Sequence, residues 1–204
     1  MPPTFPPGVL AKSPAVTGVS LLMVGFLVAW IPFVGLVGEV LVLVGFIILY
    51  LRRDDYDAPF RRFVVLGSNL LFVGVVAVVV ELVGAVLLFG LFGGSSPNPW
   101  TVALLPLLPT GLLAASVVFV VYGAADPTSR RILWIGYAAA LATAFATAAV
   151  QGELFTTGLA PSSFHTLVGV QFGVNLLAVV PYSLFAWGYY RVRRGLLGWA
   201  RPAA

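Results

Sequence analysis

The chain has 204 residues, of which 60% are hydrophobic and only 9% are charged, and its mean hydropathy is +1.05. Because a soluble domain carries roughly 25% charged residues, this composition argues against a soluble domain and predicts an integral membrane protein. The absence of cysteine excludes disulfides, thiolate metal sites and iron–sulfur clusters, and the single histidine excludes bis-histidine haem. We therefore expect no bound metal and no cofactor.

The N-terminal tail, residues 1–14, contains five prolines and one lysine. No apolar periodicity supports a helix there, so we expect an extended tail. A cleaved signal peptide is the alternative for the first thirty residues. An uncleaved first span is favoured, because no A-x-A cleavage site follows and the apolar character resumes directly after Pro32.

The apolar run from Ala15 to Leu51 is too long for one crossing. As a single helix it would measure roughly 55 Å, against about 30 Å of hydrocarbon core. Pro32 opposes a continuous helix, while Gly35 and Gly38 allow a tight turn. We therefore predict a hairpin of two spans that turns within Trp30–Glu39.

The remaining apolar blocks give four more spans. We predict an all-α, polytopic transmembrane helix bundle with six spans at about residues 15–31, 35–51, 63–92, 101–122, 132–150 and 166–190, followed by a basic tail at 191–204. In this threading all eleven lysines and arginines lie on one side, in the two tails and in the loops at 52–62 and 123–131. The positive-inside rule then places both termini in the cytoplasm and the protein in the cell membrane. The same arrangement explains the net charge of +4 without nucleic acid as a partner.

Small residues in the fifth and sixth spans recur at four-residue spacing, which lets helices approach closely in lipid. These candidate packing positions are Gly136, Ala140, Ala144 and Ala148, together with Gly169 and Gly173. They can serve packing within the chain or an interface with a second copy or a larger membrane complex. In the fourth span, Pro106 and Pro109 predict a kink, with a broken transporter-type helix as the alternative.

Two acids fall within predicted spans, where a charged side chain costs roughly 2.5–3.5 kcal/mol on insertion scales. At helical rise, Glu39 lies ~18 Å above the inner membrane edge and Glu81 ~27 Å above it. Gln171 and Asn175 share one face of the sixth span, in its outer half. We predict a candidate polar site from these four residues, in which Glu39, Gln171, Asn175 and the Pro106 kink line an outer-facing cavity. The alternatives for Glu39 are a solvated position at the turn and a polar contact with another helix.

The loop at 52–62 reads RRDDYDAPFRR. Its three aspartates suggest magnesium-dependent phosphate or prenyl chemistry, but the D-D-x-D spacing lacks a second acidic motif. A hydrated loop that neutralises its own charge is the favoured interpretation.

The stretch IPFVGLVGEVLVLVGFIILYLRRDDYDAPFRRFVVLGSNLLFVG resembles the opening of small archaeal multi-spanning membrane proteins of unassigned function. The resemblance rests on an I-P-[FY]-[VI]-G turn, a glycine-spaced apolar helix and a polar loop that leads into a glycine-bearing span. It covers about the first ninety residues and implies a prokaryotic cell membrane, with no catalytic residue to carry over.

Three functions remain open at this point. Abundant packing motifs favour a non-catalytic accessory component of a membrane assembly or homo-oligomer. Glu39 favours a transporter or channel for a small solute, cation or proton, because acids inside membranes often mark pathways. The acidic inner loop is the only support for a lipid-modifying enzyme.

Overall fold

The computed structural model describes residues 14–31, 34–91, 99–157, 169, 172–173 and 176–198, and these residues are helical apart from short turns. The helices are α1 (Pro14–Ala29), α2 (Gly35–Leu51), the short 3-10 helix η2 (Arg53–Asp55), α3 (Ala58–Leu91), α4 (Pro99–Leu104), α5 (Leu107–Val120), α6 (Pro127–Thr157) and α8 (Val179–Gly198). The predicted all-α class is confirmed for this part of the chain.

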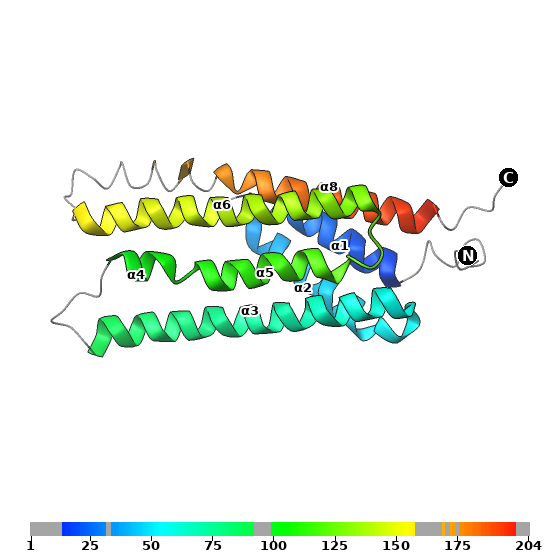
Figure 1. Cartoon of the computed structure of the whole chain (residues 1–204), viewed down its shortest axis with the longest axis horizontal. Helices are drawn as coiled ribbons and strands as arrows, with labels where there is room; N and C mark the ends of the chain where they lie inside the picture. Colours follow the sequence, from blue (N-terminus) through cyan, green and yellow to red (C-terminus); the bar gives the residue numbers. More distant parts are fainter. Residues whose placement is uncertain are drawn as a thin grey trace.

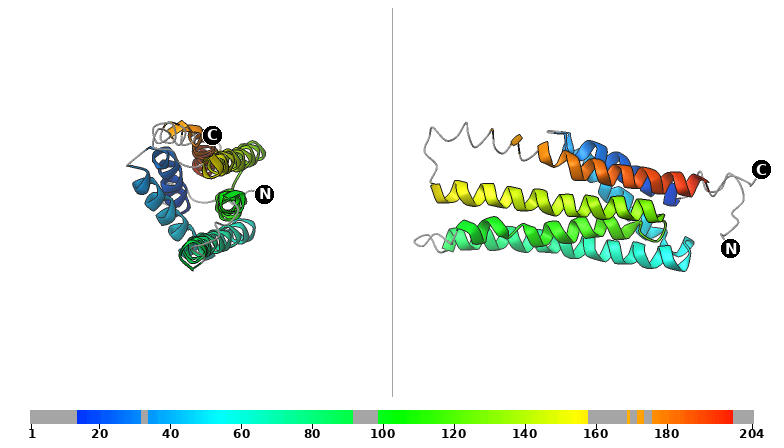
Figure 2. Two further views of the ribbon diagram at one scale, coloured as in Figure 1. Left: turned by 90° about the vertical axis from the view of Figure 1, so that its left-hand side faces the viewer. Right: turned by 45° about the horizontal axis from the view of Figure 1, so that its top comes forward.

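Seen from its end, the bundle is a ring of helices (Figure 2). Around the ring, α1 packs between α2 and α8, α6 packs between α8 and α5, and α5 packs against α3. The contact between α2 and α3 closes the ring and is the sparsest of these contacts. The long helices α3 and α6 extend along the bundle, whereas α1 and α2 lie only in the half nearer the chain termini (Figure 1).

Among the described residues, two helices are long and apolar enough to cross a membrane: α3 over Ala58–Gly84 and α6 over Pro127–Gly152. Helices α1, α2 and α5 are apolar but shorter. Large apolar side chains face outward on several helices, for example Leu36 (71% exposed), Phe72 (70%) and Leu108 (68%). Exposed apolar surface of this kind is consistent with membrane association.

The limits of α2 coincide with the predicted span, whereas α3 and α8 extend beyond theirs. Helix α3 begins at Ala58, inside the predicted loop, because the Oδ1 atom of Asp57 accepts a hydrogen bond from the backbone N–H of Phe60 at 3.3 Å. Such a cap satisfies a donor that the first helical turn leaves unpaired. Helix α8 continues through the basic segment predicted as a tail and ends at Gly198.

Helix α6 begins at Pro127 and ends at Thr157, so it exceeds the predicted span at 132–150 on both sides. Its start is fixed by Asp126, whose Oδ1 atom accepts the backbone N–H of Ser129 at 2.7 Å. Proline is well suited to the first helical position, since its missing N–H would be unpaired there in any case.

The proline kink predicted in the fourth span is a break between two helices. Helix α4 ends at Leu104 and α5 begins at Leu107. Pro106 lies between them, and its carbonyl accepts the backbone N–H of Thr110 at 3.0 Å. The missing N–H of proline interrupts the hydrogen-bond ladder, which is enough to explain the break.

The core connects α1, α5 and α8 through aromatic side chains. The ring centroid of Phe26 lies 5.5 Å from those of both Phe185 and Tyr189. Tyr189 is fully buried, and its hydroxyl donates a hydrogen bond to the Val117 carbonyl at 2.6 Å. A buried hydroxyl without such a partner would cost about 1–3 kcal/mol, so this bond fixes the position of α8 against α5.

Glycines let α1 and α2 approach to backbone contact. A β-carbon at Gly25 would lie 2.7 Å from the Gly38 carbonyl oxygen, and one at Gly45 would lie 2.9 Å from the Gly18 carbonyl oxygen. Within each helix the two glycines are seven residues apart, so they lie on one face. Any side chain at these positions would force the two helices apart.

Glycines also allow α3 and α5 to pack closely. A β-carbon at Gly67 would lie 2.5 Å from the Val120 nitrogen, and one at Gly74 would lie 2.8 Å from Leu113 Cδ2. These glycines are again seven residues apart. We call the two contacts the glycine seams.

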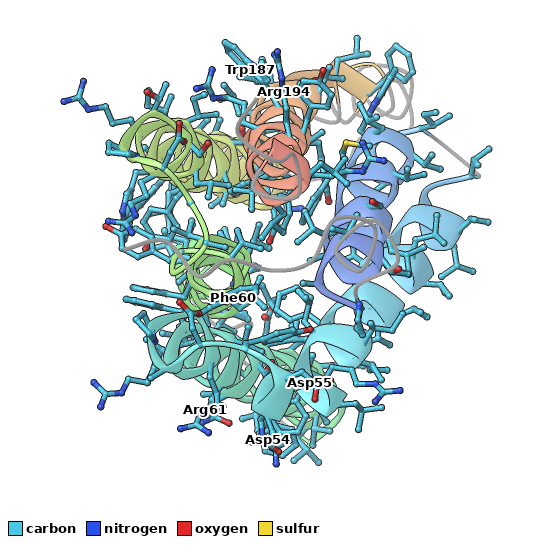
Figure 3. The ribbon with its side chains drawn as sticks, turned by 90° about the vertical axis from the view of Figure 1, so that its right-hand side faces the viewer. Asp54, Asp55, Phe60, Arg61, Trp187 and Arg194 are labelled. Carbon is cyan, nitrogen blue, oxygen red and sulfur yellow. The ribbon has the colours of Figure 1, made fainter. Side chains whose placement is uncertain are left out.

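The arginines of the described residues gather at the end of the bundle that is nearer the chain termini, which we call the basic end. They are Arg52, Arg53, Arg61, Arg62, Arg130, Arg131, Arg191, Arg193 and Arg194. Figure 3 looks onto this end, with Arg61 on α3 and Arg194 on α8.

The substitution Gly25→Leu tests the α1–α2 seam. We expect it to lower the free energy of unfolding by about 1–3 kcal/mol, because a larger side chain must displace the facing backbone. Thermal unfolding in mild detergent measures the change. The matched control is Gly84→Leu on α3, where an added β-carbon meets nothing within 4 Å; equal losses for both variants would contradict the seam.

Candidate functional site

A cavity of about 590 Å³ lies inside the ring. Its wall takes side chains from α1, α2, α3, α4, α5, α6 and α8. Small-molecule sites commonly have volumes of roughly 300–1,000 Å³. The cavity is therefore large enough for a small organic ligand.

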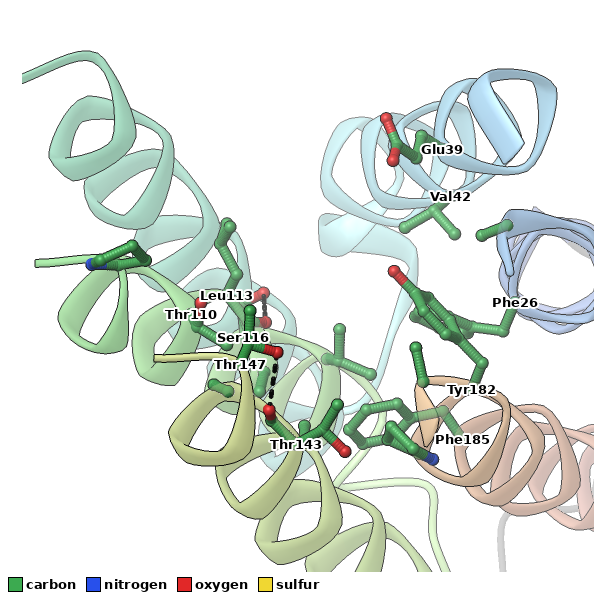
Figure 4. A pocket seen from close by; sticks show the side chains of 18 of the residues that line it. Phe26, Glu39, Val42, Thr110, Leu113, Ser116, Thr143, Thr147, Tyr182 and Phe185 are labelled. Atoms are coloured by element: carbon green, nitrogen blue, oxygen red, sulfur yellow. Dashed lines mark hydrogen bonds between the residues drawn. The ribbon is translucent and has the colours of Figure 1, made fainter. Parts of the chain in front are cut away.

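Most of the cavity wall is apolar. Phe26 and Phe185 come from α1 and α8, and they face Leu113 of α5 across the space (Figure 4). Phe46 of α2 adds a third aromatic ring. A ligand that fills this cavity must present mainly apolar surface to it.

Three hydroxyl groups in the wall are already hydrogen-bonded to their own helices. Ser116 donates to the Leu113 carbonyl at 2.6 Å, Thr143 to the Ala139 carbonyl at 2.9 Å and Thr147 to the Thr143 carbonyl at 2.9 Å. The bonds from Ser116 and Thr147 are drawn in Figure 4. With their protons used in this way, these hydroxyls present oxygen acceptors to the cavity.

Of the described residues that line the cavity, Glu39 is the one with a carboxylate. It lies on the face of α2 that also carries Val42 and Phe46, at spacings of three and seven residues (Figure 4). Glu39 is exposed, and no hydrogen bond or ion pair joins it to another residue that the structure describes. Together with the acceptor oxygens of the wall, it makes the cavity suitable for a cationic or hydrogen-bond-donating group.

Gln151 of α6 and Tyr182 of α8 also line the cavity, and sequence reasoning did not select them. The Tyr182 hydroxyl points from α8 toward Val42 (Figure 4). Gln151 lies just beyond the predicted span at 132–150, but α6 continues past it. The signal was present, because Thr143, Thr147 and Gln151 recur at four-residue spacing and so share one helix face.

Of the predicted polar site, Glu39 is the member that the structure places at the cavity, and Pro106 lines it as well. Glu81 is half-buried on α3 and is not among the lining residues. Gln171 and Asn175 lie outside the described residues. The predicted proximity of Glu39, Gln171 and Asn175 therefore stays a prediction.

The predicted packing positions have different surroundings. A β-carbon at Gly136 would lie 3.0 Å from the Phe185 ring, so this position packs α6 against α8. Ala140, Ala144 and Ala148 line the cavity. For Gly169 and Gly173, an added β-carbon would meet nothing within 4 Å among the described atoms.

The aspartates of the loop at 52–62 are each engaged locally. Asp57 caps α3, while Asp54 and Asp55 lie 3.9 Å from Arg61 and Arg52 respectively. Within the described ranges, no group of three or more acidic, histidine or cysteine side chains could hold a metal ion. The loop therefore offers no arrangement for the magnesium chemistry that its sequence suggested.

Comparisons with protein-family models, with curated proteins and with solved structures find no match for this chain. The resemblance of the first ninety residues to small archaeal membrane proteins therefore remains a prediction, and the cavity has to be interpreted from its own chemistry.

Proposed function

We propose that the chain crosses a membrane six times, with both termini on the cytoplasmic side. The spans are α1, α2, α3, the broken pair α4–α5, α6 and a last span that ends in α8. Three observations support this: the length and apolarity of α3 and α6, the exposed apolar side chains around the ring, and the arginines at one end. Positive charge on one side of a bundle is the usual determinant of orientation.

Single cysteines test this topology, because the natural chain contains none. We expect Ser95→Cys, in the connection that follows α3, to react with a membrane-impermeant maleimide on intact cells. Thr128→Cys, at the start of α6, should react only after the cells are opened. Labelling of both sites on intact cells, or of neither, would contradict the threading.

For the activity, we propose that the protein binds a small lipophilic cation in the cavity and carries it across the membrane. The observation that carries this proposal is the position of Glu39, an acid without a described partner at the wall of an otherwise apolar cavity of about 590 Å³. Apolar walls accommodate the body of such a ligand, while the carboxylate compensates its charge. The sparse α2–α3 contact offers a lateral route by which a membrane-dissolved molecule reaches the cavity.

Glu39→Gln tests this role with tetraphenylphosphonium as the probe. We expect its affinity for the purified protein to fall about tenfold or more, because glutamine removes a coulombic attraction of roughly 2 kcal/mol for charges about 8 Å apart at an effective dielectric constant of about 20. Uptake of the probe into proteoliposomes should fall in parallel. Titration calorimetry and a tetraphenylphosphonium electrode measure the two effects.

Two controls make this result specific. Glu81→Gln removes the other described span acid, which does not line the cavity, and should leave both measurements unchanged. Tetraphenylborate has nearly the same shape with the opposite charge, so Glu39→Gln should not weaken its binding. Equal effects of the two variants, or wild-type affinity in Glu39→Gln, would contradict the proposal.

A packing component of a larger assembly is the second candidate. The room beside Gly169 and Gly173 favours it, because glycines at this spacing accept a closely packed helix. The same experiment separates the two functions, since a pure packing component transports neither ion.

A further inference from the structure

A second hollow lies at the basic end, apart from the central cavity. It measures about 600 Å³ and runs between the α5–α6 connection, Gly123–Ala125, and the last turns of α8. Four of its lining residues, Trp187, Tyr190, Arg191 and Arg194, recur at spacings of three and four along α8. They therefore lie on one face of that helix. We call this hollow the basic groove.

The residues that line the basic groove carry a net positive charge, which favours the binding of an anion. Arg130, Arg191 and Arg194 line it together with Asp126, so three positive charges face one negative charge. The carboxylate of Asp126 is already engaged, because its Oδ2 atom lies 3.2 Å from Arg191 Nη2 and its Oδ1 atom caps α6. Hydrogen bonding from Ser129 and the charge of Arg191 lower the pKa of Asp126, so the carboxylate stays ionised and still leaves two arginines uncompensated.

Two of the arginines are held in place with donors to spare. Arg130 donates from Nε to the Tyr122 carbonyl at 3.2 Å, and its guanidinium lies 4.6 Å from the centroid of the Tyr122 ring. The Nε atom of Arg191 is buried and has no hydrogen-bond partner in the described structure. A buried donor without an acceptor is costly, so an acceptor beside the Arg191 guanidinium would stabilise this side chain.

Aromatic side chains lie next to these charges. Trp187 is 54% exposed and Tyr190 is 47% exposed. Trp187 precedes Arg194 by two helical turns, which places it deeper in the membrane if the basic end faces the cytoplasm. A phospholipid matches this order along the membrane normal. Its acyl chains lie at the depth of the aromatic rings, and its phosphate lies at the depth of the arginines, nearer the water.

We infer that the basic groove binds the phosphate headgroup of an anionic phospholipid of the inner leaflet. The guanidinium groups of Arg130, Arg191 and Arg194 supply the charge-assisted hydrogen bonds, and Trp187 contacts the upper acyl chain. Arginine suits this role because its planar fork matches the oxygens of a phosphate. The inference rests on the membrane placement proposed above, but it does not depend on any ligand of the central cavity.

Native mass spectrometry of the full-length protein in mild detergent tests this inference, with phosphatidylglycerol and phosphatidylcholine of equal chain length as probes. We expect the anionic lipid to bind at least tenfold more tightly. Arg194→Gln should weaken its binding about fivefold, the equivalent of one basic group near a membrane surface. Arg194 is exposed, so this change leaves the fold intact; Arg130→Gln is the second variant and should act in the same direction.

The matched control is Arg131→Gln, which removes an exposed arginine next to Arg130 that does not line the groove. It should leave the lipid affinity unchanged. Equal binding of the two lipids, or equal losses in Arg131→Gln and Arg194→Gln, would overturn the inference. Displacement of phosphatidylglycerol by millimolar glycerol phosphate would also overturn it, because the groove would then select a soluble phosphate compound. None of these outcomes affects the Glu39 experiment.

Discussion

Close backbone contact at glycines is the constraint on which this bundle depends. In lipid, helices gain little from the hydrophobic effect and associate mainly through close packing. The glycine seams supply such packing within the pairs α1–α2 and α3–α5, whereas Gly136 and Gly188 make room for side chains, Phe185 and Leu133, between α6 and α8. The chain is therefore an arrangement of tightly joined pairs around a common axis.

The cavity follows from how these pairs meet. The face of α6 that carries Ala140, Ala144 and Ala148 forms part of the cavity wall. Small residues on this wall leave volume for a ligand, while Phe26, Phe46 and Phe185 limit its shape. Glu39 lies in the cavity wall on α2, the helix that makes only sparse contact with α3. In the proposed function, the cation enters at this sparse contact, so that neither glycine seam has to open.

Sequence periodicity and composition predict the helical class, the position of α2 and the hairpin before it, because long apolar blocks and a Pro-Gly turn are local signals. They also predict Glu39 as a candidate site residue, because a carboxylate in an apolar segment is costly in free energy. The lateral arrangement was not predictable, because sequence gives depth along a helix but not which helix lies beside it. For the same reason the sequence does not distinguish packing positions from cavity-lining ones: Ala140, Ala144 and Ala148 are predicted as packing positions, and in the structure they line the cavity. Gln151 was missed because a polar segment suggested a loop, whereas the Asp126 cap and the good helix formers that follow extend α6 past it.

The central claim is that an accessible cavity lies within the membrane part of the ring, and thiol accessibility tests it most directly. Ala144 lines the cavity, while its neighbour Phe145 is 56% exposed on the outside of α6, so cysteines at the two positions share one depth. In a lipid bilayer, a small cationic methanethiosulfonate should modify Ala144→Cys, and tetraphenylphosphonium should slow the reaction, whereas Phe145→Cys should stay unmodified. An unreactive Ala144→Cys, or equal reaction at both positions, would contradict the account.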